Sequence, residues 1–327
     1  MIPRPKIIGT GAALPDRVLT NHDLEQMVET SDAWIMARTG IKERRIAVPG
    51  EFTSTFATAA ARKALEMAGV SPVDLDLIIC GTVTPDFPFP STACIVQSNL
   101  GATRAAAFDL SAACSGFLYG LSIAEKFING KAATTVLVIG VEVLSRIVDW
   151  SDRNTCCLFG DGAGAVVLTA SEGSSGILST HIYSDGGHWT LLHQPGPGNR
   201  TPASQELLDN GERFIRMQGN EVFKLAVRAM EEAAHTALSA NGLTVADLDY
   251  LIPHQANRRI IDAIGKRLGL GSDKLFVNLE RYGNTSSASI PIALDEANRQ
   301  GLLKENALVL LDAFGGGVTW ASVLMRW

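Results

Sequence analysis

The chain has 327 residues, of which 46% are hydrophobic and 19% are charged, and its formal net charge is −6 at pH 7. This composition is typical of a globular protein that is long enough for one large or two modest domains. The acidic balance argues against nucleic acid or an anionic membrane as the main partner, and no apolar run approaches the roughly 18–20 residues that cross a bilayer.

Five cysteines stand at positions 80, 94, 114, 156 and 157, and no two of them form a C-x-x-C pair. This spacing fits neither a disulfide framework nor a zinc site. Free thiols are typical of a reducing compartment, and no apolar signal core follows the first residues. The sequence therefore predicts a cytoplasmic protein without a bound metal.

The first half of the chain alternates predicted strands and helices. It begins with a strand over 6–8 that runs into Gly9-Thr10-Gly11. A dinucleotide-binding fingerprint needs a third glycine and a helix at this point, but Leu14 and Pro15 follow instead. Apolar spacing and glycine stops predict the other elements, which are a short helix within 21–37, a helix over 53–68, and strands over 75–80, 136–140 and 165–168.

One cysteine stands where a short strand turns into a helix. Phe108 and Leu110 alternate as in a strand, and apolar residues recur at helical spacing from 117 to 128. This helix is apolar nearly all round, so we expect it to be central and buried. The unpaired N–H groups and macrodipole at its start favour the thiolate of Cys114, although a lone buried cysteine is also an ordinary core residue.

The second half of the chain repeats this order. A predicted helix over 220–240 precedes a strand over 247–252, a helix over 257–268 follows, and 276–279 stands where 108–110 stood. Such alternation predicts a layered α/β fold of two pseudo-twofold-related halves, residues 1–175 and 176–327, with one central helix from each half. The Gly-, Pro-, Asn- and Ser-rich segment 184–212 predicts a long surface excursion.

The repeat brings candidate reactive side chains together. Equivalent strand-to-helix turns meet near a pseudo-twofold axis, and the turns of the two halves carry Cys114 and Asn284. His254 lies just after the strand of the second half that repeats 75–80. The three side chains are therefore expected to converge although they lie far apart in the sequence.

These residues lie in five motifs: Ala113-Cys114-Ser115-Gly116-Phe117, Phe159-Gly160-Asp161-Gly162-Ala163-Gly164, Pro253-His254-Gln255-Ala256-Asn257, Gly283-Asn284-Thr285-Ser286 and Ala313-Phe314-Gly315-Gly316-Gly317. In them the chain strongly resembles β-ketoacyl-acyl-carrier-protein synthase III, the initiating condensing enzyme of type II fatty-acid synthesis, within the thiolase superfamily. The resemblance implies a thiolase-like αβαβα layered architecture and a homodimer.

The resemblance also implies a two-step reaction. Cys114 would take the acyl group from an acyl-CoA, with the backbone N–H groups of Cys114 and Gly316 as the oxyanion hole. Malonyl-acyl carrier protein would then lose CO2, and His254 and Asn284 would hydrogen-bond the enolate oxygen. Neutral donors suit this task because the oxygen becomes negative without deprotonating them. No cofactor is implied, since the CoA thioester is a substrate.

Further positions are assigned from the resemblance. Trp34 and Arg153 would sandwich the adenine of CoA, Arg38 would lie near its phosphates, and Asn257 would contact the pantetheine arm. Phe89 would reach across the dimer interface and shorten the acyl pocket, which favours acetyl as the primer. Six basic residues would dock the acidic carrier protein on an otherwise acidic surface, namely Lys224, Arg228, Arg258, Arg259, Lys266 and Arg267.

Neighbouring families fit less well. A degradative thiolase needs a second cysteine in the C-terminal glycine turn, where this chain has Phe314 before Gly315. Elongating synthases pair the cysteine with two histidines, and here Asn284 stands at the second position. Two alternatives stay open at this point: a paralogous condensing enzyme with another acyl donor or acceptor, and a non-catalytic scaffold that binds acyl carriers.

Overall fold

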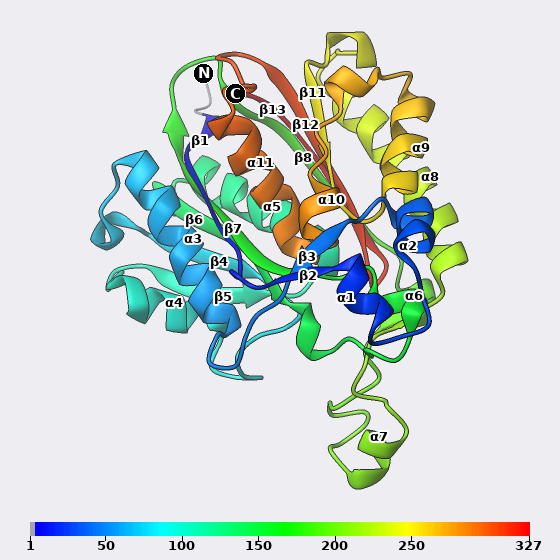
Figure 1. Cartoon of the computed structure of the whole chain (residues 1–327). Coiled ribbons are helices and arrows are strands. Elements are labelled where there is room, and N and C mark those ends of the chain that lie inside the picture. Colours follow the sequence, from blue (N-terminus) through cyan, green and yellow to red (C-terminus); the bar gives the residue numbers. More distant parts are fainter. Residues whose placement is uncertain (1–3) are drawn as a thin grey trace.

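The computed structural model describes residues 4–327, and its first sheet has five strands in the order β1-β7-β6-β4-β5 (Figure 1). Strand β4 is parallel to both β5 and β6, whereas β7 is antiparallel to β6 and β1. The outermost strand β5 is only half-buried. The strands are β1 (Arg4–Ala13), β4 (Leu77–Gly81), β5 (Ala106–Leu110), β6 (Thr135–Val143) and β7 (Asp161–Ser171).

The second sheet repeats the pattern with four strands in the order β11-β12-β13-β8. Strand β11 is parallel to β12, and the other pairs are antiparallel. The bounds are β8 (Gly176–Ser184), β11 (Tyr250–Pro253), β12 (Leu308–Gly315) and β13 (Thr319–Arg326). Strands of the first sheet thus come from residues 4–171 and those of the second from 176–326.

The strand-like role expected for residues 276–279 is wrong. The isolated parallel bridge to Leu251 lies just before this segment, at Leu275, and the N–H of Phe276 donates to the carbonyl of Leu251 over 3.0 Å. The helix α10 (Leu279–Tyr282) begins at the end of the segment. The side chain of Gln255 takes the place of a neighbouring strand: it donates to the carbonyl of Phe276 and accepts from the N–H of Asn278. Backbone groups with these hydrogen bonds do not need to pair with a neighbouring strand.

Helices and sheets form five layers, as the family resemblance implies (Figure 1). The helices α3 (Thr53–Ala68) and α4 (Thr92–Leu100) cover the outer face of the first sheet, and α8 (Gly219–Ser239) and α9 (Arg258–Leu268) cover that of the second. Between the sheets lie α5 (Gly116–Asn129) and α11 (Ser289–Arg299). The predicted central burial of the helix that follows Cys114 is confirmed.

The glycines of β1 serve close packing rather than phosphate binding. A Cβ atom at Gly9 would lie 2.2 Å from the carbonyl oxygen of Ala64, and one at Gly11 would lie 2.3 Å from that of Ala60. Both alanines belong to α3 and are fully buried. Only glycine lets the strand and the alanine-rich helix approach so closely.

The segment 21–37 forms two helices instead of the single one expected. They are α1 (Asn21–Glu25) and α2 (Asp32–Thr39), and each has its own N-cap, Thr20 and Ser31. Glu25 accepts the N–H of Asp32, which fixes the break between them. The strands β2 (Val18–Thr20) and β3 (Glu43–Arg45) flank these two helices and pair antiparallel. Elsewhere there are the helix α6 (Arg153–Cys156) and seven short 3₁₀ turns within residues 4–327, of which η2 (Ala113–Ser115) and η7 (Ser286–Ala288) precede the central helices.

The predicted excursion is an arm that projects from the body of the molecule and carries α7 (Gln205–Asp209) at its end (Figure 1). The short strands β9 (Leu192–His193) and β10 (Arg216–Met217) pair at its base. Leu192 and Met217 both line a cavity that Cys114 and His254 also line. The base of the arm therefore forms part of the wall of this cavity. No helix within residues 4–327 is both long and apolar enough to cross a membrane.

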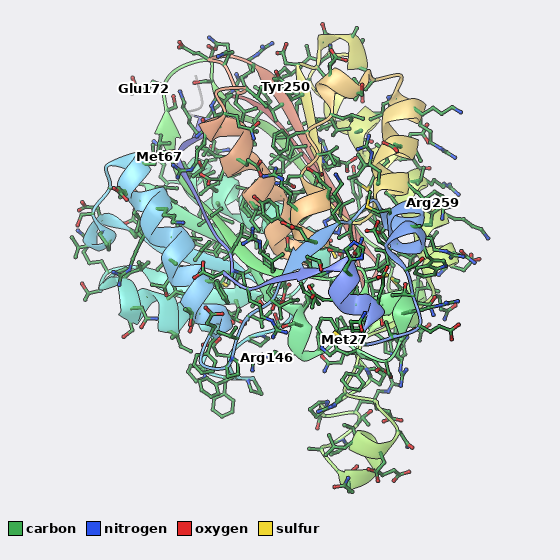
Figure 2. The ribbon with its side chains drawn as sticks, in the orientation of Figure 1. Met27, Met67, Arg146, Glu172, Tyr250 and Arg259 are labelled. Atoms are coloured by element: carbon green, nitrogen blue, oxygen red, sulfur yellow. The ribbon has the colours of Figure 1, made fainter. Side chains whose placement is uncertain are left out.

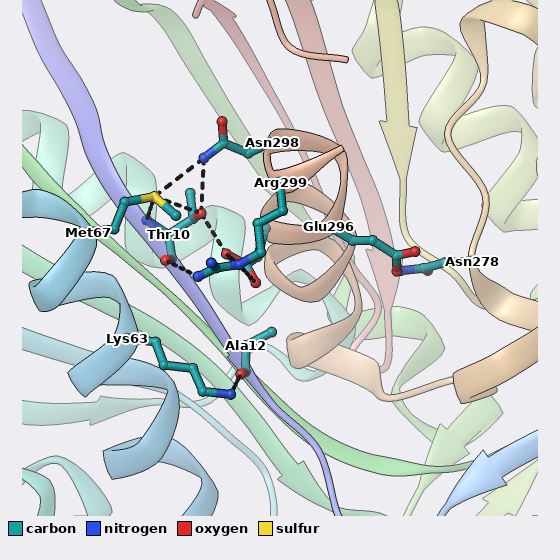
Figure 3. A network of polar contacts seen from close by, with 9 residues as sticks. Thr10, Ala12, Lys63, Met67, Asn278, Glu296, Asn298 and Arg299 are labelled. Carbon is teal, nitrogen blue, oxygen red and sulfur yellow. Dashed lines mark hydrogen bonds and ion pairs between the residues drawn. The ribbon is translucent and has the colours of Figure 1, made fainter. Parts of the chain in front are cut away.

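A polar network ties the two halves together (Figure 3). The hydroxyl of Thr10 in β1 donates to Asp295 of α11 over 2.7 Å, and Arg299 holds the same carboxylate over 2.9 Å. Asn298 donates to the Thr10 oxygen and to the sulfur of Met67 in α3. Because Thr10 and Asp295 are buried, water does not compete for the hydrogen bond between them, and this bond links the two halves.

Candidate active site

The candidate nucleophile lies on a strained turn. Cys114 belongs to η2 between β5 and α5, and the preceding residue, Ala113, has φ +46°. Two hydrogen bonds to β13 brace the turn: Thr319 donates to the carbonyl of Ala112 over 2.8 Å, and Ser115 donates to the carbonyl of Thr319 over 3.1 Å. Such strain persists only where the surroundings impose it, as they do at many functional sites.

One cavity of about 430 Å³ holds all three predicted reactive residues. Cys114, His254 and Asn284 line it, and their exposed fractions are 7%, 3% and 8%. Cys114 enters from η2, His254 from the end of β11, and Asn284 from the turn between α10 and η7. The apolar wall comes from α8 and β12, through Val222, Phe223, Ala226, Met230 and Phe314.

His254 is an uncharged imidazole in this site. Burial lowers its pKa from 6.5 to about 3. Its Nδ1 is 2.6 Å from the hydroxyl oxygen of Ser289, and that oxygen also accepts the N–H of Gln255 over 3.3 Å. When the Ser289 hydroxyl donates to Nδ1, the ring carries its proton on Nε2 and is a donor toward the cavity.

The amide of Asn284 has a defined orientation. Its Oδ1 accepts the backbone N–H of Ser286 over 2.8 Å, so its NH2 group is left as the donor for other partners. The backbone of Asn284 is itself held on both sides, because its N–H donates to Leu158 over 2.8 Å and its carbonyl accepts from Gly160 over 3.0 Å. The Phe159-Gly160 segment therefore positions this residue.

The thiol of Cys114 is protonated at rest, contrary to the expectation of a stabilised thiolate. Burial raises its pKa to about 12, the hydroxyl of Ser286 opposes this rise, and the carboxyl of Glu142 adds to it. Because Cys114 is only 7% exposed, its thiolate loses its hydration, and this loss outweighs the stabilisation that the N–H groups at the start of the helix give to the thiolate.

The glycine turn of β12 lies against the nucleophile. A Cβ atom at Gly315 would lie 2.6 Å from the backbone nitrogen of Cys114, so no other residue fits there. Gly316, the predicted oxyanion-hole residue, is one position further, where a Cβ atom would lie 3.7 Å from that of Ala113. Both glycines thus border η2.

Three of the four residues assigned to CoA line the cavity, and the fourth, Arg153, lies over the ring of Trp34. The three are Trp34, Arg38 and Asn257, and Asn257 caps α9 while donating to the carbonyl of Arg38 over 3.0 Å. The guanidinium carbons of Arg38 and Arg153 lie 4.8 and 4.9 Å from the centre of the Trp34 ring. Because Arg153 stacks directly on Trp34, an adenine can enter between them only if Arg153 moves outward.

The six basic residues assigned to carrier docking differ in their partners. Four form exposed ion pairs: Lys224 with Glu221, Arg228 with Glu232, Arg258 with Asp262, and Arg267 with Glu231. Arg259 instead lies over the ring of Phe223 at 5.4 Å, lines the cavity and extends from α9 into solvent (Figure 2). Phe89 does not line this chain's own cavity, and it is 85% exposed.

Three residues of the site were missed in the sequence. Ser289 positions His254, Ser286 positions Asn284, and Glu142 is fully buried beside them. Ser289 and Glu142 follow no spacing rule, because they act across elements far apart in the chain, whereas Ser286 lies two positions after Asn284. The one available signal was the run of hydroxyl residues after Asn284.

The two sheets around paired central helices, with a cysteine, a histidine and an asparagine in one cavity, define a thiolase-fold condensing enzyme, an acyltransferase. Sequence profiles described as "3-Oxoacyl-[acyl-carrier-protein (ACP)] synthase III" and as its C terminal match residues 108–186 and 238–327. The chain belongs to the β-ketoacyl-[acyl-carrier-protein] synthase III family.

Individual relatives cover the chain almost completely. The synthase III of Caldanaerobacter subterraneus subsp. tengcongensis is 56% identical over 98% of this chain and 97% of its own length. That of Natranaerobius thermophilus is 55% identical over 98% and 99%. The crystal structure of 3-oxoacyl-[acyl-carrier-protein] synthase III from Aquifex aeolicus VF5 is 53% identical, has a TM-score of 0.92, and covers 99% of this chain and 100% of that one.

Proposed function

We propose that this protein starts fatty-acid synthesis by moving a short acyl group, preferably acetyl, from acyl-CoA to Cys114 and joining it to malonyl-acyl carrier protein. The products are a β-ketoacyl-acyl carrier protein, CoA and CO2. The observation that carries the assignment of residues is the convergence of Cys114, His254 and Asn284 on one cavity.

In the first step the sulfur of Cys114 bonds to the thioester carbon, and the bond to the CoA sulfur breaks. The thiol proton leaves Cys114 and the departing CoA thiolate takes one up, so charge balances. The N–H groups of Cys114 and Gly316 hold the negative oxygen in the tetrahedral intermediate. The loss of one such donor typically costs about 3 kcal/mol of transition-state stabilisation.

In the second step the malonyl thioester loses CO2, and the electron pair moves onto its carbonyl oxygen. Nε2–H of His254 and the NH2 group of Asn284 donate to that oxygen. Two features support these roles: burial keeps the imidazole neutral, and Ser286 occupies Oδ1 of the amide. The carbanion then attacks acyl-Cys114, and the Cys114 thiolate leaves.

Substrate binding follows the shape of the cavity. Trp34, Arg38, Arg153 and Asn257 hold the CoA end, and the reaction uses neither a cofactor nor a metal. For the carrier protein, Arg259 is the leading contact of the six basic residues, because it lies at the cavity beside Phe223. The exposed ion pairs of Lys224, Arg228, Arg258 and Arg267 must exchange partners on docking, and such pairs are weak. Lys266 is the sixth member.

The proposal includes a homodimer in the cytoplasm. The half-buried edge strand β5 and the exposed Phe87 and Phe89, at 55% and 85%, support a second copy as the partner. Phe89 would then close the acyl pocket of that copy. All five cysteines are free thiols, which suits a reducing compartment.

The test starts with acetyl-CoA and intact-mass spectrometry. An acetyl adduct that disappears in the Cys114→Ala variant is expected. A missing adduct, or one that survives in this variant, would support a non-catalytic scaffold instead. Product analysis with malonyl-acyl carrier protein and a panel of acyl-CoA primers then separates this function from that of a paralogous condensing enzyme with another donor.

A further inference from the structure

A carboxyl group that the mechanism above does not use lies buried behind the reactive residues. Glu142 is near the end of β6 and has no exposed surface. None of the ion pairs found within residues 4–327 includes it. An ionised carboxyl that is buried without a cation costs free energy unless hydrogen bonds compensate for its lost hydration.

One side of this carboxyl group holds the loop that follows β4. Oε2 accepts the hydroxyl of Thr84 over 2.5 Å, the N–H of Thr84 over 3.1 Å and the hydroxyl of Thr82 over 3.2 Å. The N–H of Val83 donates to both oxygens over 3.1 Å. The loop gives most of its donors to Oε2, so Oε1 shares only the Val83 N–H and can take a partner on the other side.

The other side meets the turn that carries Asn284. The hydroxyl of Ser286 lies 3.4 Å from Oε1 of Glu142. Ser286 has φ +49°, is 3% exposed, and gives its N–H to Oδ1 of Asn284. Its turn η7 packs against η2, which carries Cys114; burial raises the pKa of that thiol, and hydrogen bonding by the Ser286 hydroxyl lowers it. A hydroxyl has one proton to donate, so Glu142 and Cys114 compete for it.

We propose that Glu142 is a positioning residue that acts through Ser286 and controls how readily Cys114 gives up its proton. When the carboxyl is ionised, the Ser286 proton points to Oε1 and the sulfur anion lacks this donor. When the carboxyl is protonated, it donates to the Ser286 oxygen, and the Ser286 proton is free for the sulfur. This inference rests on Cys114 as the nucleophile of the proposed function.

Both states of the carboxyl group are within reach near neutral pH. Burial raises the pKa of Glu142 to about 7, and the hydrogen bonds from Thr82, Val83 and Thr84 limit the rise. Besides burial, the charge of Glu142 raises the pKa of Cys114 in η2 and of Cys80 in β4, and the carboxyls of Asp86 and Asp109 also raise that of Cys80. Asp86 accepts an N–H group at the start of α3, and Asp109 accepts two at the start of α4. In the part of the chain that the structure describes, neither forms a hydrogen bond with Ser286.

The test measures alkylation of Cys114 by iodoacetamide as a function of pH, with the modified residue identified by peptide mass spectrometry. In Glu142→Gln the apparent pKa of Cys114 should fall by about one unit, because the charge is gone and the Ser286 proton turns to the sulfur. In Ser286→Ala alone it should stay near that of the natural protein, because the ionised carboxyl already holds the Ser286 proton. In the double variant it should stay above that of Glu142→Gln, because the freed donor is then missing. Asp109→Asn, a carboxyl of the same sheet without a link to Ser286, is the matched control and should leave it unchanged.

The dependence on Ser286 separates this role from a structural one, since a merely loosened site admits water and lowers the pKa of Cys114 in Ser286→Ala as well. A fall in Ser286→Ala, or a fall in the double variant as large as that in Glu142→Gln alone, would overturn the proposal. Where Glu142→Gln does not fold, the alkylation rates of the natural protein and Ser286→Ala decide. The natural protein should react faster than Ser286→Ala only below about pH 7, where the Glu142 carboxyl is protonated, and a rate ratio that does not change with pH would overturn the proposal. Adduct formation with acetyl-CoA in the natural protein tests the proposed function separately.

Discussion

Replacement of His254 by alanine should separate the two steps of the reaction. The imidazole is 3% exposed in the cavity that Cys114 and Asn284 share, and burial keeps it neutral with a pKa of about 3. In the proposed mechanism it donates a hydrogen bond only when the malonyl thioester becomes an enolate. The variant should therefore still accept an acetyl group on Cys114 but fail to condense it.

The size of the loss follows from the burial of this donor. Removal of one preorganised donor from a water-excluded site lowers the rate by about 10²–10³, or roughly 3–4 kcal/mol. Asn284 continues to donate to the same oxygen, so the loss should not reach that of Cys114→Ala. The fold should survive, because the hydroxyl oxygen of Ser289 still accepts the N–H of Gln255.

The assay follows both steps in one preparation. Intact-mass spectrometry measures the rate of acetylation by acetyl-CoA, and formation of β-ketoacyl-acyl carrier protein measures condensation. His235→Ala, which removes an exposed histidine of α8, is the matched control. Condensation at the normal rate in His254→Ala, or an equal loss in both steps, would refute the reasoning. The neutral imidazole further implies that the pH profile of condensation has no inflection from His254 near 6.5.

Three further predictions concern binding and stability. In steady-state assays Trp34→Ala should raise KM for acetyl-CoA about tenfold, because roughly 1.4 kcal/mol of stacking is lost, and leave KM for malonyl-acyl carrier protein unchanged. Trp189→Ala on the arm is the control and should change neither KM. Asp295→Ala should lower the free energy of unfolding in urea by about 2–3 kcal/mol, because the buried Thr10 hydroxyl loses its acceptor, while Asp262→Ala, which breaks an exposed pair, should cost less than about 1 kcal/mol. Because burial raises the pKa of Glu142 from 4.5 to about 7, its protonation stabilises the fold fully below about pH 4.5 and this contribution is lost as the pH rises through about 7. Between pH 4.5 and 8 the free energy of unfolding should thus fall by about 3 kcal/mol more in the natural protein than in Glu142→Gln, at about 1.4 kcal/mol per pKa unit. An equal fall in both proteins would contradict the raised pKa of Glu142.

Several interpretations of the sequence depended on local structure alone, and these agree with the tertiary structure. Helix α3 spans 53–68 as predicted, with Gly69 in the left-handed conformation that ends it. Helix α5 begins just after Cys114 and ends at Asn129. Periodicity and glycine stops encode such elements directly, because their hydrogen bonds join residues only a few positions apart.

Other interpretations failed where a distant group intervened. Residues 276–279 have the composition of a strand, but the side chain of Gln255 satisfies their backbone. The start of a helix favours a thiolate, yet the burial of Cys114 favours the thiol. Each outcome is set by neighbours that the order of the chain does not reveal.

The sequence by itself determined several long helices, the strands of the first sheet, the internal repeat and the motifs that carry the family resemblance, because these depend on residue types at short spacings. Only the tertiary structure decided which side chains share the cavity, which groups are protonated there, and how Ser286, Ser289 and Glu142 support the reactive residues. Burial and hydrogen-bond competition arise when distant segments pack, and pKa values and donor directions follow from that packing.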